Sequence, residues 1–178
     1  MKREIQFTIL ALALGGAACA SDDKDDKPAG AALKCTSSGK NAFDTYGAPA
    51  FITVNDKIFA NVVADLGANG SAKLGTSFNA PASDPARLAT FKGNLAAFLV
   101  FAYGGPTSIT YEGKSYEGPQ DMVEVHRGTA ITNDQYDYFV ANIVVPALTS
   151  SGVPANDVSS CFAPVVADPS FKASIVGK

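Results

Sequence analysis

The sequence predicts a single domain of the all-α class, and three observations support that prediction. Apolar residues recur at intervals of three and four positions along three long stretches, as they do on one face of a helix. Each stretch begins at a proline or a capping residue and ends at a glycine, the usual signals of helix boundaries. No stretch carries a strong strand signal.

The first long helix is expected to begin at Pro49, since proline is well tolerated in a first helical turn, and to end at Gly67. Residues 41–47, just before it, form a short helical turn at most. Its apolar positions make one stripe with two residues beside it: Phe51, Val54, Ile58, Val62 and Leu66, with Phe59 and Val63. Residues 67–83 should form a loop with two apolar anchors, Leu74 and Phe78.

The second helix is expected to start at Asp84, a capping residue that is followed by a first-turn proline. It carries the longest apolar face of the chain: Leu88, Phe91, Leu95, Phe98, Leu99 and Ala102. Gly104-Gly105-Pro106 should stop it. Residues 107–118 contain Tyr-Glu-Gly twice and form either a local repeat or a small hairpin.

A short helix from Pro119 carries His126, the only histidine of the chain, and ends at Gly128. Thr132 and Gln135 then form a capping box that starts the third long helix. The apolar face of that helix is Tyr136, Phe139, Val140, Ile143, Val144 and Ala147.

Proline should disturb the last part of the helical pattern. Pro146 lacks a backbone N–H and should kink the third long helix, which closes at Ser151-Gly152. A final helix is expected over residues 153–168, where Pro164 can break it. Residues 169–178 form a C-terminal tail without a strong pattern.

Composition narrows the classes of function. With 47% hydrophobic residues the chain can bury a sizeable core, and its net charge is −3. Because no basic patch alternates with aromatic residues, a nucleic-acid partner is not expected. Most of the 11 phenylalanines lie in the helical stretches, where they serve either core packing or an apolar ligand pocket.

The N-terminus has the pattern of a bacterial export signal over residues 1–20: Lys2 and Arg3 precede an apolar run too short to span a membrane. Gly16-Ala17-Ala18-Cys19 resembles a lipobox, which would lipidate Cys19, although leucine is commoner at the position of Gly16. Ordinary cleavage after Ala20 is the alternative. Residues 21–40 are charged and aperiodic, which predicts a disordered tether. We therefore expect an exported protein, periplasmic or held at the membrane by an N-terminal lipid.

Three cysteines are present. If Cys19 carries lipid, Cys35 and Cys161 remain, and an oxidising compartment makes them candidates for a disulfide. The alternative is two buried free thiols. With one histidine and no Cys-x-x-Cys, a zinc site is not expected.

A lone histidine is more often a surface residue than a metal ligand, but a neutral imidazole at a helix end can also bind a haem iron. Three passages within residues 41–168 support that interpretation, because they resemble the truncated haemoglobins, or two-over-two globins, and group one most closely. Residues 43–47 are similar to the family's opening turn and residues 98–106 to its helix end before the proximal loop. Residues 116–132, around His126, resemble the family's proximal motif and are the most specific of the three; Gly152-Val153-Pro154 falls at its last interhelical turn.

The resemblance implies a two-over-two helical sandwich around one haem b per chain, with His126 as the axial ligand of the iron. It also implies reversible binding of oxygen, nitric oxide or carbon monoxide, and some members oxidise nitric oxide to nitrate. The residues that it places on the distal side of the haem are Phe59, Phe91, Leu95, Phe98 and Leu99. Those that it places on the proximal side are Met122, Ile131 and Tyr136.

Two positions depart from the family. Many members have tyrosine at the position of Phe59 and glutamine at that of Leu95, and neither side chain here can donate a hydrogen bond to bound oxygen. We therefore expect weak stabilisation of oxygen, whereas haem binding needs only an apolar slot and the imidazole. Tyr103 and Asn94 are the other side chains that could supply a donor. The segment between Pro106 and Pro119 is also longer than is usual in the family.

Three functions remain open. The first is an exported, lipid-anchored haem globin that binds a diatomic gas and depends on an unidentified reductase. The second is a haem-free globin fold that acts as a binding or structural lipoprotein. The third is an enzyme, a nitric-oxide dioxygenase or a peroxidase, but a peroxidase needs a distal acid–base group and the chain has no second histidine. The sequence thus favours gas binding over dedicated catalysis.

Overall fold

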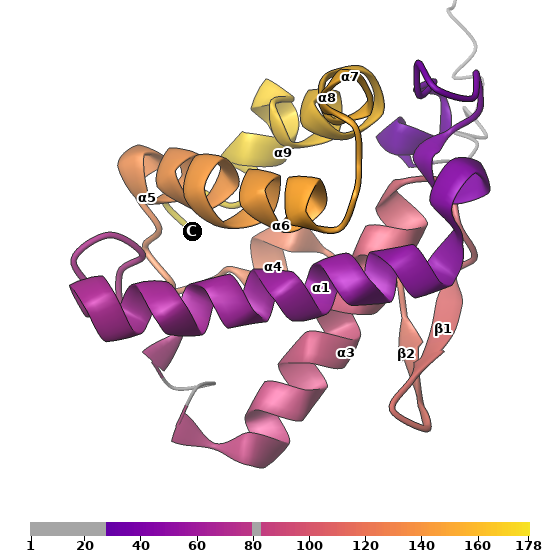
Figure 1. Cartoon of the computed structure of the whole chain (residues 1–178). Coiled ribbons are helices and arrows are strands. Elements are labelled where there is room, and N and C mark those ends of the chain that lie inside the picture. The colour runs from indigo at the N-terminus through magenta and orange to yellow at the C-terminus, as the bar shows by residue number, and fades with distance from the viewer. Residues whose placement is uncertain (1–27, 80–82) are drawn as a thin grey trace, which may run out of the picture.

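The computed structural model describes residues 28–79 and 83–178, and these form a mostly helical fold with one small hairpin (Figure 1). The all-α class is therefore the right description at the coarse level. The expected signal peptide, Cys19 and the first part of the tether lie outside the described residues. Among the described residues, no helix is both long and apolar enough to cross a bilayer.

Helix α1 (Ala42–Asn69) is the longest element and spans the molecule in Figure 1. Asn41 caps it by accepting a hydrogen bond from the Asp44 N–H at 2.6 Å. Gly47 has a φ of 72° and interrupts the helix, which explains why the turn before Pro49 and the helix after it appear as separate signals. The helix runs two residues beyond the expected end at Gly67 and stops at Gly70, whose φ is 57°.

Helix α3 (Pro85–Ala102) begins where the sequence predicts, with the Asp84 carboxylate accepting hydrogen bonds from the N–H groups of Ala86 and Arg87. It packs against α1, and its fully buried positions are small residues rather than those of the long apolar face. The buried positions of α3 are Gly93, Ala96, Ala97, Val100 and Ala102. The larger Phe91, Leu95, Phe98 and Leu99 are only half-buried.

Residues 107–118 form a hairpin, which decides between the two alternatives that the sequence left. Strands β1 (Ser108–Tyr111) and β2 (Lys114–Glu117) pair antiparallel, with Ile109 opposite Tyr116. The hairpin packs on α3, where Tyr116 lies over Gly93. It is joined to α1 by the Tyr111 hydroxyl, which donates to Asp56 at 2.7 Å.

The third long helix is built from α5 (Asn133–Phe139), the π-helix η2 (Val140–Val144) and α6 (Val145–Ser150), and it runs alongside α1 (Figure 1). The capping box of Thr132 and Gln135 is present in both directions. Instead of a kink at Pro146 alone, the helix widens just before it, and the Val145 N–H bonds to the carbonyl five residues back. Proline has no N–H for the regular ladder, so the helix changes its pitch there.

The last helix also contains a π-helical turn just before a proline. This helix consists of α7 (Ala155–Asp157), the π-helix η3 (Val158–Phe162) and α8 (Ala163–Val166). The Ala163 N–H bonds to the Val158 carbonyl one residue before Pro164, so the proline widens the helix without breaking it. Residues 169–178, expected to be a tail, contain the short helix α9 (Pro169–Ala173), which Asp168 caps.

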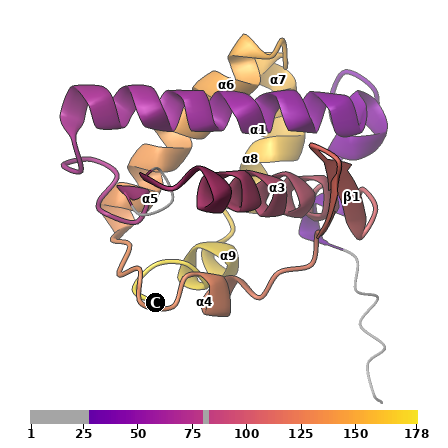
Figure 2. The same ribbon diagram turned by 90° about the horizontal axis from the view of Figure 1, so that it is seen from below.

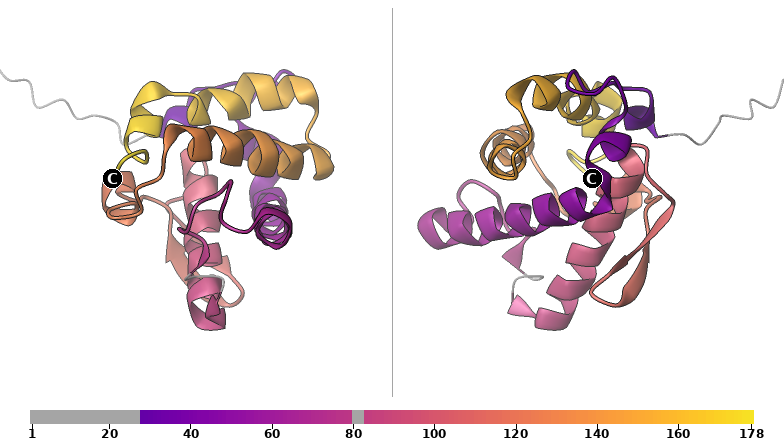
Figure 3. Two further views of the ribbon diagram at one scale, coloured as in Figure 1. Left: turned by 90° about the vertical axis from the view of Figure 1, so that its left-hand side faces the viewer. Right: turned by 45° about the vertical axis from the view of Figure 1, so that its right-hand side comes forward.

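The segment 28–40 is folded, which corrects its assignment to the tether. It contains the 3-10 turn η1 (Ala29–Ala31), which contacts α1, α3 and α8 (Figure 3). A disulfide joins Cys35 to Cys161 across 126 positions of sequence, the pairing that the sequence suggested. Next to it, the buried Asp157 accepts the Ser37 N–H at 2.9 Å and the hydroxyls of Ser37 and Tyr46.

The hydrophobic core lies where α1, α3, η2–α6 and η3 meet. Val63, expected beside the apolar stripe of α1, lies outside this core and is 58% exposed. Leu74 and Phe78 do anchor the loop between α1 and α3, as expected. The buried core residues include Phe51, Ile58, Val100, Ile143, Cys161 and Phe162.

Candidate functional site

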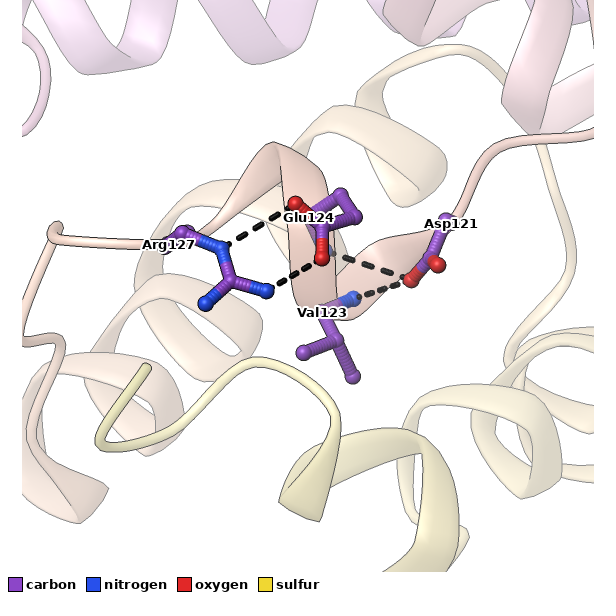
Figure 4. A network of polar contacts seen from close by, with 4 residues as sticks. All are labelled: Asp121, Val123, Glu124 and Arg127. Atoms are coloured by element: carbon purple, nitrogen blue, oxygen red, sulfur yellow. Dashed lines mark hydrogen bonds and ion pairs between the residues drawn. The ribbon is translucent and has the colours of Figure 1, made fainter.

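His126 stands at the end of α4 (Met122–Val125), a single turn that short-range contacts hold in place (Figure 4). The Asp121 carboxylate accepts hydrogen bonds from the N–H groups of Val123 and Glu124, at 3.0 and 3.2 Å. Arg127 pairs with Glu124 through two of its nitrogens. The turn is thus built from residues within six positions, which is why its sequence pattern could be recognised.

The orientation of the imidazole follows from one hydrogen bond. Nδ1 of His126 lies 2.8 Å from the carbonyl oxygen of Met122. Because a carbonyl oxygen can only accept, Nδ1 carries the proton and the neutral ring has its lone pair on Nε2. This is the arrangement that a metal-binding histidine normally has, with one nitrogen fixed by the backbone and the other available to the metal.

The chain after His126 is held in a specific course. Gly128 has a φ of 79°, and Thr129 bonds back to the His126 carbonyl through its N–H and its hydroxyl, at 3.0 and 2.7 Å. Ala130 has a φ of 50°, which is uncommon outside glycine. Its N–H bonds to the carbonyl of Lys178, so the C-terminus supports this conformation.

Two of the expected distal residues lie together. Phe59, buried on α1, meets Phe91 of α3 edge to face, with ring centroids 5.3 Å apart. Phe91 also contacts Phe78 at 6.0 Å, and Phe78 stacks on Phe139 at 5.7 Å. The sequence predicts Phe78 as a loop anchor and Phe139 as part of a helix face, and it does not show that four aromatic rings from four segments meet. The spacing signal could not reveal this, because the rings are far apart in sequence.

The other expected distal residues share the half-buried face of α3. Leu95, Phe98 and Leu99 are each half-buried, and all pack at the edge of the main core. Phe98 stacks on Phe171 of α9, with centroids 5.9 Å apart and planes 6° apart. Phe171 belongs to the segment expected to be a plain tail, and no sequence signal had marked it.

The expected proximal residues do not form one group. Met122 supplies the carbonyl that orients His126, and the Ile131 carbonyl accepts the Gly177 N–H at 2.9 Å. Tyr136 instead turns to the last helix, where its buried hydroxyl donates to the Val166 carbonyl at 2.7 Å. Burial, followed by the charges of Asp137 and Asp168, raises the pKa of Tyr136 to about 12.

A pocket of about 320 Å³ lies at Tyr136, between α5, α8 and α9. Of the expected haem-lining residues it includes Tyr136 alone. Its wall is completed by Asp137, Val140, Ala163, Val166, Ala167 and Lys172. The pocket is therefore distinct from the face of α3 that carries Phe91, Leu95 and Phe98.

The residues present fit a haem by their chemistry. A haem needs one neutral imidazole with a free nitrogen, which the hydrogen bond to Met122 leaves on His126. It also needs an apolar surface, and Phe91, Leu95, Phe98 and Leu99 provide a half-buried one, which Phe78 and Phe171 cover in part. Comparison of the sequence with protein-family models and with curated proteins gave no match.

Proposed function

We propose that this domain is a haem protein of the truncated-globin type, a two-over-two helical sandwich that binds a diatomic gas. The observation that carries the proposal is the hydrogen bond between His126 Nδ1 and the Met122 carbonyl, because it presents Nε2 as a ligand. The half-buried apolar face of α3 supports it as a surface for a flat apolar group. A bound haem would supply the iron that holds oxygen, nitric oxide or carbon monoxide.

The protein's own residues would have separate tasks. His126 would hold the iron from one side, and the turn capped by Asp121 would fix the direction of its ring. Phe59 and Phe91 would keep water from the gas on the other side, since neither ring carries a polar group. The four-ring group around Phe91 would make that side rigid.

A haem titration of the purified protein tests the proposal. We expect one equivalent of haem to give a sharp Soret band, and His126→Gly to lose the stable ferrous complex until imidazole is added. Val125→Ala is the matched control, because it alters the neighbouring exposed residue and leaves the imidazole. Absence of a Soret band in the wild type would instead favour a haem-free binding module, and an unchanged ferrous spectrum in His126→Gly would refute the ligand assignment.

We also propose that the domain works outside the cytoplasm, tied to a bacterial membrane by lipid on Cys19. The disulfide between Cys35 and Cys161 supports export, since such bridges persist in oxidising compartments. Mass spectrometry of the protein from native envelopes tests this. A lipid mass on an N-terminal Cys19 is the expected result, and an unmodified N-terminus at Ser21 would contradict it.

A further inference from the structure

The last eleven residues, 168–178, form a strap that lies across the site. Only its first half is helical, in the five-residue α9, which Asp168 caps through the N–H groups of Ser170 and Phe171 at 2.8 and 2.9 Å. The rest continues as a turn to Lys178. Figure 2 shows α9 and the C-terminus on the same side of the molecule as α4.

One side of the strap rests on α3. The Phe171 ring stacks on Phe98, a residue of the half-buried apolar face. A parallel stack at this separation is an attractive contact between two rings. The strap therefore covers part of the surface on which the proposed haem would lie.

The other side of the strap is bonded to the chain that follows His126. The Gly177 N–H donates to the Ile131 carbonyl at 2.9 Å, and the Ala130 N–H donates to the Lys178 carbonyl at 3.1 Å. Lys172 adds an ion pair with Asp137 at 2.6 Å and lies over the Tyr136 ring at 5.3 Å. The strap thus connects the face of α3 with the segment between His126 and α5.

These contacts are few, so the strap can detach from the rest of the domain. Within the strap only Ile175 is fully buried, and a five-residue helix is not stable by itself. Segments with little buried apolar surface open locally without unfolding the rest of a protein. Undocking of the strap would release Phe98 and leave the disulfide and the main core intact.

We propose that the strap is a latch on the haem site: it must leave Phe98 before a haem can lie against α3, so haem binding and strap docking compete. The proposal rests on the function proposed above, and it adds a conformational step to it. Only molecules with an undocked strap take up haem, so the apparent affinity is reduced by the fraction that is docked. Weakening the strap should accordingly speed uptake and tighten binding.

The rate of haem uptake by purified apoprotein, followed in stopped flow by the Soret band, tests the latch. We expect Phe171→Ala to take up haem about two- to tenfold faster than the wild type, which corresponds to the loss of one aromatic pair. Lys172→Met, which removes the ion pair with Asp137, should act in the same direction. Ser170→Ala is the matched control, since it alters an exposed strap residue whose backbone alone is used in the cap.

A second measurement follows the strap itself. Trypsin cuts after Lys172, and mass spectrometry reports the fragment that is lost. We expect slow cleavage in the apoprotein and faster cleavage once haem is bound, because the strap is then displaced.

The outcomes separate the two proposals. If neither the wild type nor any variant gives a Soret band, both the function and the latch are refuted. If the wild type binds haem but Phe171→Ala and Lys172→Met take it up at the wild-type rate and Lys172 of the wild type stays protected, the function stands and the latch is wrong. If only the weakened-strap variants bind haem, the latch is supported in its strongest form.

Discussion

The hydroxyl of Tyr103 donates a hydrogen bond to the carbonyl oxygen of Phe162 at 3.0 Å, and the two rings lie 5.1 Å apart. Tyr103 is 4% exposed and ties α3 to the last helix. It was one of two side chains that could have supplied a donor to bound oxygen. The other, Asn94, lies on the exposed side of α3.

Because Tyr103 is bonded to Phe162 and Asn94 lies on the exposed side of α3, the oxygen complex of the proposed haem protein should be weakly held. A hydrogen bond to a charge-bearing acceptor is worth about 1.5–3 kcal/mol, so Phe59→Tyr should slow oxygen release by roughly one to two decades. Carbon monoxide carries less charge, and its release should change far less. Stopped-flow dissociation with each gas measures this, with Phe43→Tyr as a control that adds a hydroxyl on α1 at a distance from Phe91. Slow release in the wild type that Phe59→Tyr leaves unchanged would show that another residue holds the gas.

Reduction of the disulfide between Cys35 and Cys161 should lower the free energy of unfolding substantially. For a loop of this length the chain-entropy model gives about 4–5 kcal/mol as an upper value. Urea unfolding with and without dithiothreitol, followed by circular dichroism, measures the loss. The double variant Cys35→Ala/Cys161→Ala should have the stability of the reduced protein, with or without dithiothreitol. An unfolding midpoint of the wild type that dithiothreitol does not change would contradict the prediction.

The Asp157 carboxylate should make stability depend on acid pH. Burial alone would raise the pKa of Asp157, but hydrogen bonds from Ser37 and Tyr46 favour the ionised form and lower it below 3.8. A lowered pKa in the folded state contributes stability that is present above 3.8 and is lost as the pH falls through the folded value. Asp157→Asn should therefore destabilise the protein at pH 7 and much less at pH 2.5.

Thermal unfolding from pH 2 to 7 measures that difference, with Asp134→Asn as an exposed control.

At the alkaline end, burial and the bond to Asp157 raise the pKa of Tyr46 to about 12. The stability contributed by Tyr46 should be complete below pH 10 and be lost as the pH rises through about 12, and Tyr46→Phe should remove this loss. For Asp157, an equal difference in unfolding temperature between Asp157→Asn and the wild type at every pH would show that the charge of the carboxylate has no effect on stability.

Gly93 should be required for the close packing of the hairpin on α3. A Cβ at this position would lie 2.2 Å from Cζ of Tyr116. Although alanine favours a helix over glycine by about 1 kcal/mol, Gly93→Ala should destabilise by roughly 1–3 kcal/mol because the ring must move. Gly67→Ala on α1 meets nothing within 4 Å and should stabilise slightly. Combining Gly93→Ala with Tyr116→Ala should cost less than the two single losses added, and simple additivity in urea unfolding would refute the contact.

The caps at Asp84 and Thr132 could be predicted because each uses partners within three residues. The hairpin could not be decided, because two four-residue strands are too short for a pattern and their position depends on Gly93, far away in sequence. The fully buried positions of α3 were also missed. Helical periodicity marks the large apolar residues, whereas close packing in this protein buries small ones such as Ala96 and Ala97.

The candidate site divides in the same way. The turn around His126 is local, and its pattern was visible in the sequence. The strap and the folded segment 28–40 have no apolar period, since a stack on Phe98, a disulfide and the carboxylate of Asp157 hold them. Such contacts depend on residues more than seventy positions apart, which a single sequence does not bring together.

The bridge from Cys35 to Cys161 also decides how the domain bears mechanical load. Tension applied to the chain ahead of residue 28 reaches Cys35 before it reaches α1, and the sulfur–sulfur bond passes it directly into η3. Helices α1 and α3, which carry the expected distal residues, then lie outside the path of the force. A domain pulled by its two ends in an optical trap should extend through residues 28–34 and 162–178, whereas residues 36–160, enclosed by the bond, should extend only after the bond is reduced.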